Sequence, residues 1–341
     1  MKQIIKTIAA GVIAVAAWSN VAASADPLLV SASKGTMHTP LLYAAENGIF
    51  EKHGVEVELK FFQTGVEMIN GLMAGTHHMN TMGSIPLIAG ASNGLDLVLI
   101  GHLHGRANAD SYSDNTGIVA DKSIKTVTDL KGKKIALPRG TGAEGYLLGV
   151  LSQNNMTASD VTLVSAKPSE LSTALRNGDV DAIAIWETHL SGTANSIESA
   201  DVLISGNCNA CYDPGTLITT NAIIKERGEQ LRKFMLAFAE ASQWVRNNLD
   251  KAAEVNIRWS NFDNVDVMKS AMRNGLNDPR MSKLTVETYK SKTVPGLKTA
   301  GKLGGDVDVD KMVDPQFVTY MMDTVPQFFD DLEAIPANKR F

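Results

Sequence analysis

Four short segments of the sequence carry residue types that bind small polar ligands. Two of them are turns of small residues that open a helix, so free backbone N–H groups and the positive helix end favour an anionic or strongly polar group. The hydroxyls of Ser84 and Thr141 add further hydrogen-bonding groups. Either turn alone is explained as well by a plain helix N-cap. The four segments are residues 31–39, 83–84, 139–142 and 186–187.

The last of these segments joins an indole to an acid. Trp186 offers a flat wall and one N–H donor, which suits stacking on a small ligand or closing over it. The same pattern also fits a core tryptophan at a hinge. Glu187 and the nearby Glu144 matter because a buried carboxylate repels a pure anion and favours a cationic or amide-bearing ligand.

Histidines cluster around the same segments. His38 lies in the first of them, and His102 and His104 follow a predicted strand in the segment Gly-His-Leu-His-Gly-Arg. On an extended chain His102 and His104 share one face, so a metal-binding pair is conceivable. No third ligand stands at a diagnostic spacing, and we therefore predict no metal site. Polar contacts to a ligand from His38, His104 or Arg106 are the favoured interpretation.

The only two cysteines, Cys208 and Cys211, have the spacing Cys-x-x-Cys. In an oxidising compartment they are predicted to form a disulfide with each other. Closing so short a loop stabilises the fold by about 2 kcal/mol, so the bond would mainly stiffen a loop. A redox centre would need the motif to open a helix, and a metal site would need two further ligands. Neither context is visible.

Motifs of common enzyme classes do not appear. The acidic run 306–310 resembles a calcium loop, but Lys311 and Phe317 stand where such a loop requires Gly and Glu. No nucleophile elbow, phosphate-binding loop, zinc-protease motif or complete dinucleotide fingerprint is present. The sequence therefore predicts neither a cofactor nor catalytic residues.

The composition is that of an ordinary globular protein. The chain has 341 residues, 44% of them hydrophobic and 20% charged, with 28 glycines and 11 prolines. These values exclude disordered, collagen-like and disulfide-scaffold classes. The formal net charge is −5. An acidic balance of this kind gives no reason to expect a nucleic-acid partner or an anionic lipid surface.

The N-terminus has the pattern of an export signal. Lys2 and Lys6 precede the apolar run 8–18, and Ala-Ser-Ala at 23–25 supplies a cleavage pattern before Asp26. The apolar run is too short to span a membrane, which takes roughly 20 residues. No cysteine follows the predicted cleavage site to carry a lipid. We therefore expect a mature protein that begins near Asp26, is free outside the cytoplasm and does not insert into the membrane.

Hydrophobic periodicity predicts two α/β units in series. Strands are expected at 28–33, 55–61, 78–82 and 95–101 with helices between them, and the same rhythm restarts after Val119. Such alternation predicts mostly parallel sheets with helices on their faces. After a strand at 216–224 the pattern is helical to the end. We therefore predict a signal peptide at 1–25, a first lobe from 26–118 and 217–341, a second lobe at 119–216, and two crossings near 115–118 and 217–221.

Several segments resemble one known family. They are Pro40 to Val55 (PLLYAAENGIFEKHGV), Asp129 to Ala136 (DLKGKKIA), Asn177 to Ala182 (NGDVDA) and the closing Trp186. They are similar to periplasmic solute-binding proteins of ABC importers for nitrate, sulfonates, taurine and thiamine-pyrimidine precursors. The resemblance implies a two-lobed type II periplasmic-binding-protein fold, a hinge, a small-molecule solute and a membrane permease as partner. His78 and Thr188 depart from the family pattern.

These observations together predict a set of ligand-binding residues and a function. The function is a non-enzymatic periplasmic binding protein that captures a small polar solute, with a sulfonate- or nitrate-like anion favoured because two helix N-termini converge. A pyrimidine or similar heterocycle stacked on Trp186 is the second interpretation. An enzyme on the same scaffold that uses histidines and a metal scavenger that uses His102 and His104 are the rivals. The predicted ligand-binding residues are Ser33, His38, Gly83, Ser84, His104, Arg139, Gly140, Thr141, Gly142, Trp186 and Glu187.

Overall fold

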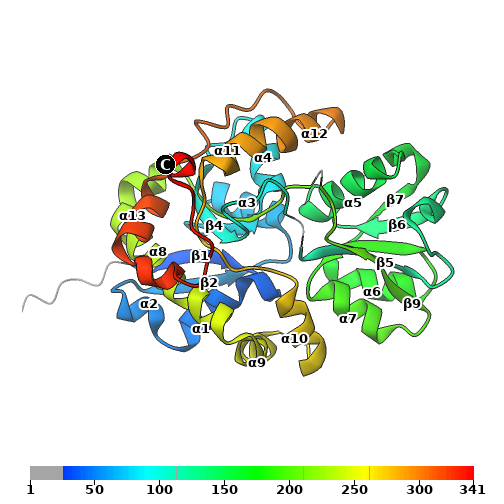
Figure 1. Cartoon of the computed structure of the whole chain (residues 1–341), viewed down its shortest axis with the longest axis horizontal. Coiled ribbons are helices and arrows are strands. Elements are labelled where there is room, and N and C mark those ends of the chain that lie inside the picture. Colours follow the sequence, from blue (N-terminus) through cyan, green and yellow to red (C-terminus); the bar gives the residue numbers. More distant parts are fainter. Residues whose placement is uncertain (1–25, 113, 210, 261) are drawn as a thin grey trace, which may run out of the picture.

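The structure is a computed structural model, and it describes residues 26–112, 114–209, 211–260 and 262–341. The predicted signal at 1–25 lies outside the described residues. The described chain forms two lobes that lie side by side along the long axis of the molecule (Figure 1). The larger lobe holds the N-terminal and C-terminal parts of the chain, and the smaller lobe holds the middle part.

The larger lobe is built on two sheets that a single bridge connects. Strands β1 and β2 pair in parallel, and β10 pairs antiparallel with β3 on one side and β4 on the other. A parallel bridge from Val30 to Met79 links β1 to the start of β3. The spatial order is therefore β2-β1-β3-β10-β4. The strand bounds are β1 Leu28–Ala32, β2 Val57–Phe61, β3 Asn80–Gly83, β4 Val98–His104 and β10 Gly215–Thr219.

The smaller lobe repeats this arrangement in one five-stranded sheet of order β7-β6-β8-β5-β9. Its β6 pairs in parallel with β7 and β8, whereas β5 pairs antiparallel with β8 and β9. The predicted two-lobed α/β fold is confirmed, and each lobe holds one antiparallel strand, β5 or β10. The bounds are β5 Thr116–Asp121, β6 Lys134–Leu137, β7 Thr162–Ser165, β8 Ala182–Trp186 and β9 Ala200–Ser205.

Helices connect the strands within each lobe and cover the sheets. Thr64 and Glu67 form a capping box at the start of α3, as their Thr-x-x-Glu spacing in the sequence indicates. The Thr64 hydroxyl accepts a hydrogen bond from the Glu67 amide, and the Glu67 carboxylate accepts one from the Thr64 amide. The larger lobe has α1 Thr39–Glu46, α2 Ile49–Lys52, α3 Gly65–Met73 and α4 Ser84–Ser92, and the smaller lobe has α5 Gly142–Gln153, α6 Pro168–Arg176 and α7 His189–Ser196.

The C-terminal third of the chain is helical and packs mainly on the larger lobe. Helical spacing in the sequence places one apolar stripe on α8, and the structure buries it fully. Its residues, all at 0% exposure, are Leu231, Phe234, Met235, Phe238 and Val245. Helix α8 packs against α1, α2 and α13. These helices are α8 Asn221–Asn247, α9 Leu249–Trp259, α10 Val265–Arg273, α11 Lys283–Thr288, α12 Val294–Thr299 and α13 Gln316–Thr324.

Two segments cross between the lobes. The first follows β4 and enters β5 at Thr116, and the second follows β9 and enters β10 at Gly215. The prediction of a crossing at 217–221 was wrong, because that stretch completes β10 and begins α8. The two crossings touch each other through a bridge between Tyr112 and Tyr212, with the Tyr112 amide donating to the Cys211 carbonyl at 3.0 Å.

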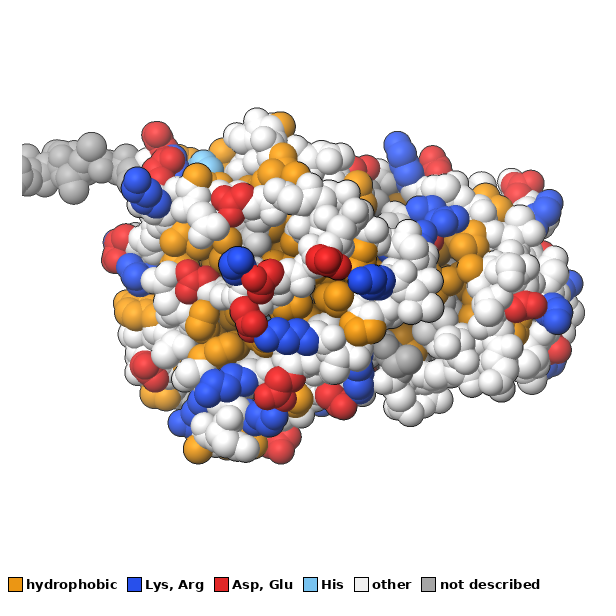
Figure 2. All heavy atoms as spheres, turned by 90° about the horizontal axis from the view of Figure 1, so that it is seen from above, with side chains coloured by type: hydrophobic (Ala, Val, Ile, Leu, Met, Phe, Trp, Pro, Cys, Tyr) orange, Lys and Arg blue, Asp and Glu red, His pale blue; other side chains and the backbone are white. Residues whose placement is uncertain are grey.

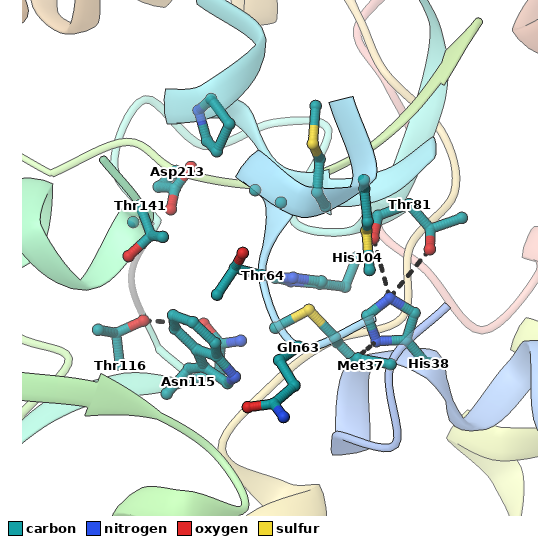
Figure 3. Close-up of a pocket in the computed structure, with 18 residues that line it drawn as sticks. Met37, His38, Gln63, Thr64, Thr81, His104, Asn115, Thr116, Thr141 and Asp213 are labelled. Carbon is teal, nitrogen blue, oxygen red and sulfur yellow. Dashed lines mark hydrogen bonds between the residues drawn. The ribbon is translucent and has the colours of Figure 1, made fainter. Parts of the chain in front are cut away.

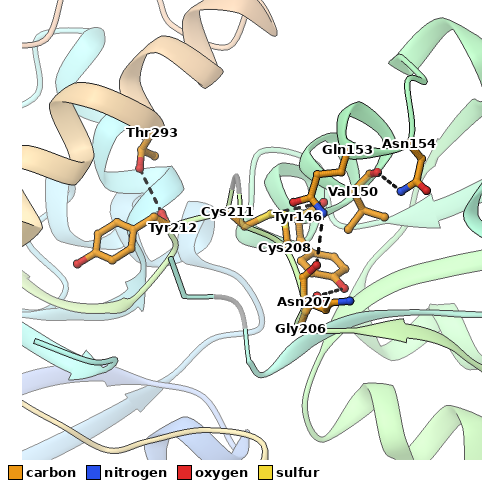
Figure 4. Close-up of a disulfide and its surroundings, with 10 residues drawn as sticks. All are labelled: Tyr146, Val150, Gln153, Asn154, Gly206, Asn207, Cys208, Cys211, Tyr212 and Thr293. Carbon is orange, nitrogen blue, oxygen red and sulfur yellow. Dashed lines mark hydrogen bonds between the residues drawn. A yellow bond between two sulfur atoms is a disulfide. The ribbon is translucent and has the colours of Figure 1, made fainter. Parts of the chain in front are cut away.

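Cys208 and Cys211 form a disulfide within the second crossing (Figure 4). Their sulfurs lie against α5, where a Cβ on Gly149 would come within 2.6 Å of Cys211 Sγ. The Tyr146 hydroxyl of the same helix donates to the Gly206 carbonyl at 2.7 Å. The crossing is thus fastened to the smaller lobe just before the chain returns to the larger one.

The surface carries charges of both signs without a dominant patch on the face shown in Figure 2. Acidic and basic side chains alternate there over both lobes, with hydrophobic side chains between them. Within the described residues, no helix is both long and apolar enough to cross a membrane.

Candidate functional site

A cavity of about 60 Å³ lies between the lobes, where strands of each lobe end (Figure 3). In open α/β sheets this edge collects ligands because strands end there and helices begin. The larger lobe contributes most of the lining, and the smaller lobe and the second crossing close the other side. The lining residues are Ser33, Met37, His38, Gln63, Thr64, Gly65, Met68, Thr81, Met82, Gly83, Pro86, His104, Asn115, Thr116, Thr141, Gly142, Trp186 and Asp213.

His38 is held in place on both ring nitrogens. Its 3₁₀ turn, Thr36–His38, follows β1 and places the ring against β3. The Nε2 atom lies 3.0 Å from the Thr81 carbonyl, which only accepts, so Nε2 carries the proton and donates. Nδ1 then accepts from the Ser33 hydroxyl at 2.9 Å. Burial lowers the pKa of His38 to about 4, which keeps the ring neutral.

His104 has one free nitrogen. At the end of β4 its Nδ1 lies 3.0 Å from the Tyr112 hydroxyl, which itself accepts from the Leu276 amide at 3.3 Å. The Tyr112 hydroxyl accepts that hydrogen bond and donates its own proton to His104 Nδ1. We therefore assign the imidazole proton to Nε2. Nε2 is buried and has no partner in the described structure. Burial lowers the pKa of His104 to about 3, so this donor is uncharged.

Asp213 occupies the N-terminus of α4. Its Oδ1 accepts from the Ser84 amide at 2.6 Å, the Ser84 hydroxyl at 2.8 Å and the Ile85 amide at 3.1 Å. These are the free groups of the Gly83–Ser84 turn that the sequence predicts to bind an anionic solute. Burial raises the pKa of Asp213, and the hydrogen bonds from Ser84 and Ile85 partly offset this. A carboxylate of the chain itself therefore caps the first of the two predicted anion sites.

A second carboxylate, Glu144, occupies the turn that opens α5. Its Oε2 accepts from the Gly140 amide at 2.7 Å, and its Oε1 pairs with Arg139 at 2.6 Å and Lys302 at 2.8 Å. Burial alone would raise the pKa of Glu144, but Lys302, the Gly140 amide and Arg139 together hold it below the usual value. Because Lys302 belongs to the larger lobe, this ion pair also joins the two lobes.

The structure brings seven of the predicted ligand-binding residues together around the cavity and places four elsewhere. Ser84 is buried under Asp213, and Arg139 and Gly140 are bound to Glu144. Glu187 is buried behind Trp186, where it accepts from Ser191 and Asn274. Those that line the cavity are Ser33, His38, Gly83, His104, Thr141, Gly142 and Trp186.

The other polar predictions fall outside the cavity. Arg106 pairs with Asp114 at 3.1 Å, and His102 lies beside Gly105 rather than in the cavity lining. Among the residues that the structure describes, no group of three His, Cys, Asp or Glu side chains could hold a metal ion.

Sequence reasoning missed Asp213 together with Gln63, Thr64, Asn115 and Thr116. Asp213 lies in the second crossing, 129 positions from the serine that it contacts. The segment Tyr-Asp-Pro-Gly at 212–215 reads as a turn. The sequence marks Thr64 only as the cap of a helix, and it gives no binding signal for Gln63. A carboxylate next to a predicted hinge was the one signal that could have been used.

The NMT1/THI5-like family model matches residues 35–252, which is more than half of the chain. The chain belongs to the NMT1/THI5-like family. Among related proteins, a putative aliphatic sulfonates-binding protein of Bacillus subtilis is 31% identical over 244 residues, covering 69% of this chain and 70% of the relative.

Two solved structures show how widely the fold is used. The alkanesulfonate-binding protein of Xanthomonas axonopodis pv. citri, bound to MOPS, superposes with a TM-score of 0.76 at 20% identity, covering 86% of this chain and 100% of that one. A desulfurization enzyme superposes with a TM-score of 0.63 at 17% identity, covering 88% and 99%. At these identities the likeness shows the fold alone, and function has to be argued from the site.

Proposed function

We propose that this NMT1/THI5-like protein is the periplasmic solute-binding component of an ABC importer. In this role it captures a small polar solute between its two lobes and delivers it to a membrane permease. The observation that carries the proposal is one cavity lined by strand ends and helix starts of both lobes. The family membership and the predicted export signal support the same role.

The lobes are proposed to close on the solute as rigid bodies joined by two crossings. Few polar side-chain contacts bridge the cleft, among them Lys302 to Glu144 at 2.8 Å, Asn274 to Glu187 at 2.9 Å and Ser169 to Gln63 at 3.2 Å. A solute that touches both lobes adds contacts that exist only in the closed state, and this difference drives closure.

We propose a division of the chain that moves the predicted boundaries by a few residues to the ends of strands. Residues 1–25 are a signal peptide, 26–115 and 215–341 form the first lobe with the first crossing, and 116–205 form the second lobe. Because β10 begins at Gly215, we place the return crossing at 206–214 rather than at 217–221.

Sulfonates are the first solutes to test, because the relative in Bacillus subtilis and the structure from Xanthomonas are described as binding them. A flat heterocycle is the second class, and one observation favours it. Trp186 lines the cavity together with Met37, Met68, Met82 and Pro86, which gives apolar walls to a small site.

An enzyme on the same scaffold is the alternative from another class. The desulfurization enzyme shares the fold, and two buried histidines line the cavity. His38, however, uses both nitrogens inside the protein, so only His104 is free to take part in proton transfer. Turnover of a bound solute that disappears in His104→Ala would favour the enzyme.

Small-angle scattering and Trp fluorescence with and without solute test the proposal together. We expect a smaller radius of gyration on solute binding and a fluorescence change that comes from Trp186. Trp186→Phe should remove the fluorescence change, whereas the matched control Trp259→Phe, at a site that contacts Glu46 and not the cavity, should keep it. If calorimetry shows that a solute binds and scattering shows an unchanged molecular envelope, the proposal is wrong.

A further inference from the structure

The charge of the cavity lining does not suit an anion. Of its 18 residues none is Lys or Arg, and Asp213 is the only Asp or Glu. The two histidines add no positive charge, since burial lowers the pKa of His38 to about 4 and that of His104 to about 3. An anionic solute would therefore meet one carboxylate and no cation.

A carboxylate of the chain already occupies the N-terminus of α4, and another lies at the turn before α5. Oδ1 of Asp213 takes the first amides of α4, and Glu144 takes the Gly140 amide before α5. The cations of that second turn, Arg139 and Lys302, are both paired with Glu144. The N-terminus of α4 therefore does not offer its positive end to a further negative group.

Two polar atoms of the residues that line the cavity can still form a hydrogen bond with a solute. None of the hydrogen bonds of the described residues reaches Asp213 Oδ2, and His104 Nε2 is unpartnered although His104 is only 3% exposed. One atom accepts and the other donates. A buried donor without a partner is costly, so the site is built to receive an acceptor.

The acceptor and the donor lie beside paired residues of two neighbouring strands. Gly83 of β3 and Gly215 of β10 are paired residues. A Cβ on Gly83 would lie 2.9 Å from Asp213 Oδ2, and a Cβ on Gly215 would lie 2.5 Å from His104 Nε2. Figure 3 shows Asp213 and His104 facing the same hollow from different elements.

We propose that the solute carries an N–H-donating or cationic nitrogen that binds Asp213 Oδ2, next to an acceptor atom that binds His104 Nε2–H. Amides, amidines and aminoheterocycles have this pair of groups, and simple anions such as nitrate or an alkanesulfonate do not. The proposal rests on the solute-binding function and narrows its substrate class.

Calorimetric titration of the mature protein with matched pairs tests the proposal. The pairs are nicotinamide with nicotinate and benzamidine with benzoate, and ethanesulfonate and nitrate are titrated alone. We expect the nitrogen-bearing member of at least one pair to bind about 10-fold or more tightly than its acid and than either simple anion. Tightest binding by an acid, ethanesulfonate or nitrate overturns the proposal, and so does no binding by any nitrogen-bearing compound.

Asp213→Asn tests whether the Asp213 carboxylate binds the solute. The amide oxygen keeps the cap on α4, and the NH₂ group replaces the acceptor Oδ2 with a donor. We expect a loss of about 10-fold or more for the nitrogen-bearing compound and a gain for its acid. Asp306→Asn, a surface change at a side chain that is 98% exposed, should alter neither. Equal affinities in wild type and Asp213→Asn overturn the proposal.

The same experiments separate the two proposals. If ethanesulfonate or nitrate binds most tightly of the compounds and scattering shows closure, the solute-binding function stands and the inference about Asp213 fails. If none of the compounds binds and the envelope never changes, both fail.

Discussion

Two carboxylates stand at the two helix N-termini that face the cleft, and the protein holds them in opposite ways. Glu144 at α5 has two cations and a backbone amide as partners, and burial of its side chain is compensated. Asp213 at α4 has three N–H and O–H donors on one oxygen and no cation. The difference shows that the turn in the smaller lobe is a structural joint, whereas the turn in the larger lobe exposes an unneutralised acceptor to the cavity.

The largest expected effect concerns the neutral surroundings of Asp213. His38 and His104 have folded-state pKa values of about 4 and about 3, below the usual 6.5, so the unfolded chain binds more protons once the pH falls below 6.5. The free energy of unfolding should therefore fall on going from pH 7 to pH 5, by about 2 kcal/mol for each of these histidines. Urea unfolding at both pH values measures this.

His104→Gln is the matched variant for that experiment, because an amide keeps a donor but does not titrate. Its free energy of unfolding should depend less on pH by about 2 kcal/mol over the same interval. An identical pH dependence in the variant would mean that His104 is not buried and neutral, and the argument about charge in the cavity would lose its basis.

The next effect concerns the position of Asp213 between the two helices. A Cβ on Gly142, the first residue of α5, would overlap the Asp213 carboxylate. We expect Gly142→Ala to destabilise the protein by about 2–3 kcal/mol through overpacking and to weaken solute binding. Gly228→Ala is the control, because a Cβ there meets nothing within 4 Å, and it should leave binding unchanged. Denaturant unfolding and titration of both variants measure these effects.

A smaller effect is expected from the disulfide that anchors the second crossing. Replacing both Cys208 and Cys211 by Ser removes the closure of a short loop, and the free energy of unfolding should fall by about 2 kcal/mol. Because the second crossing also carries Asp213, solute affinity should fall more in this variant than in Gly149→Ser. Gly149→Ser disturbs the contact between α5 and the two sulfurs but leaves the disulfide intact. Affinity unaffected by loss of the disulfide would show that α4 alone positions Asp213.

Local patterns in the sequence predicted the elements and part of the cavity lining, because strand ends and helix starts leave marks within a few residues. The capping box at Thr64 and the stripe of α8 are examples, and Ser33, His38, Gly83 and Trp186 were placed by the strand that each follows. Asp213 left no such mark, because its partner Ser84 is remote in sequence. The orientation of Arg139 was also unpredictable, since it depends on Glu144 being shared with distant Lys302.

Replacing each carboxylate by its amide tests the contrast between Glu144 and Asp213 most directly. Glu144→Gln removes a charge that Lys302 and Arg139 neutralise, so we expect the free energy of unfolding to fall by about 1–2 kcal/mol. The loss is modest because both cations are partly exposed to solvent.

Asp213→Asn removes a carboxylate whose pKa in the folded protein is raised above its usual value by burial. Such a group stabilises the fold only at low pH and costs stability as the pH rises through its folded pKa, so Asp213→Asn should be at least as stable as wild type at pH 7. Glu144→Gln should change solute affinity less than Asp213→Asn does. Parallel unfolding curves and titrations of the two variants measure all four quantities, and equal stability changes of the same sign would remove the distinction between the two helix ends.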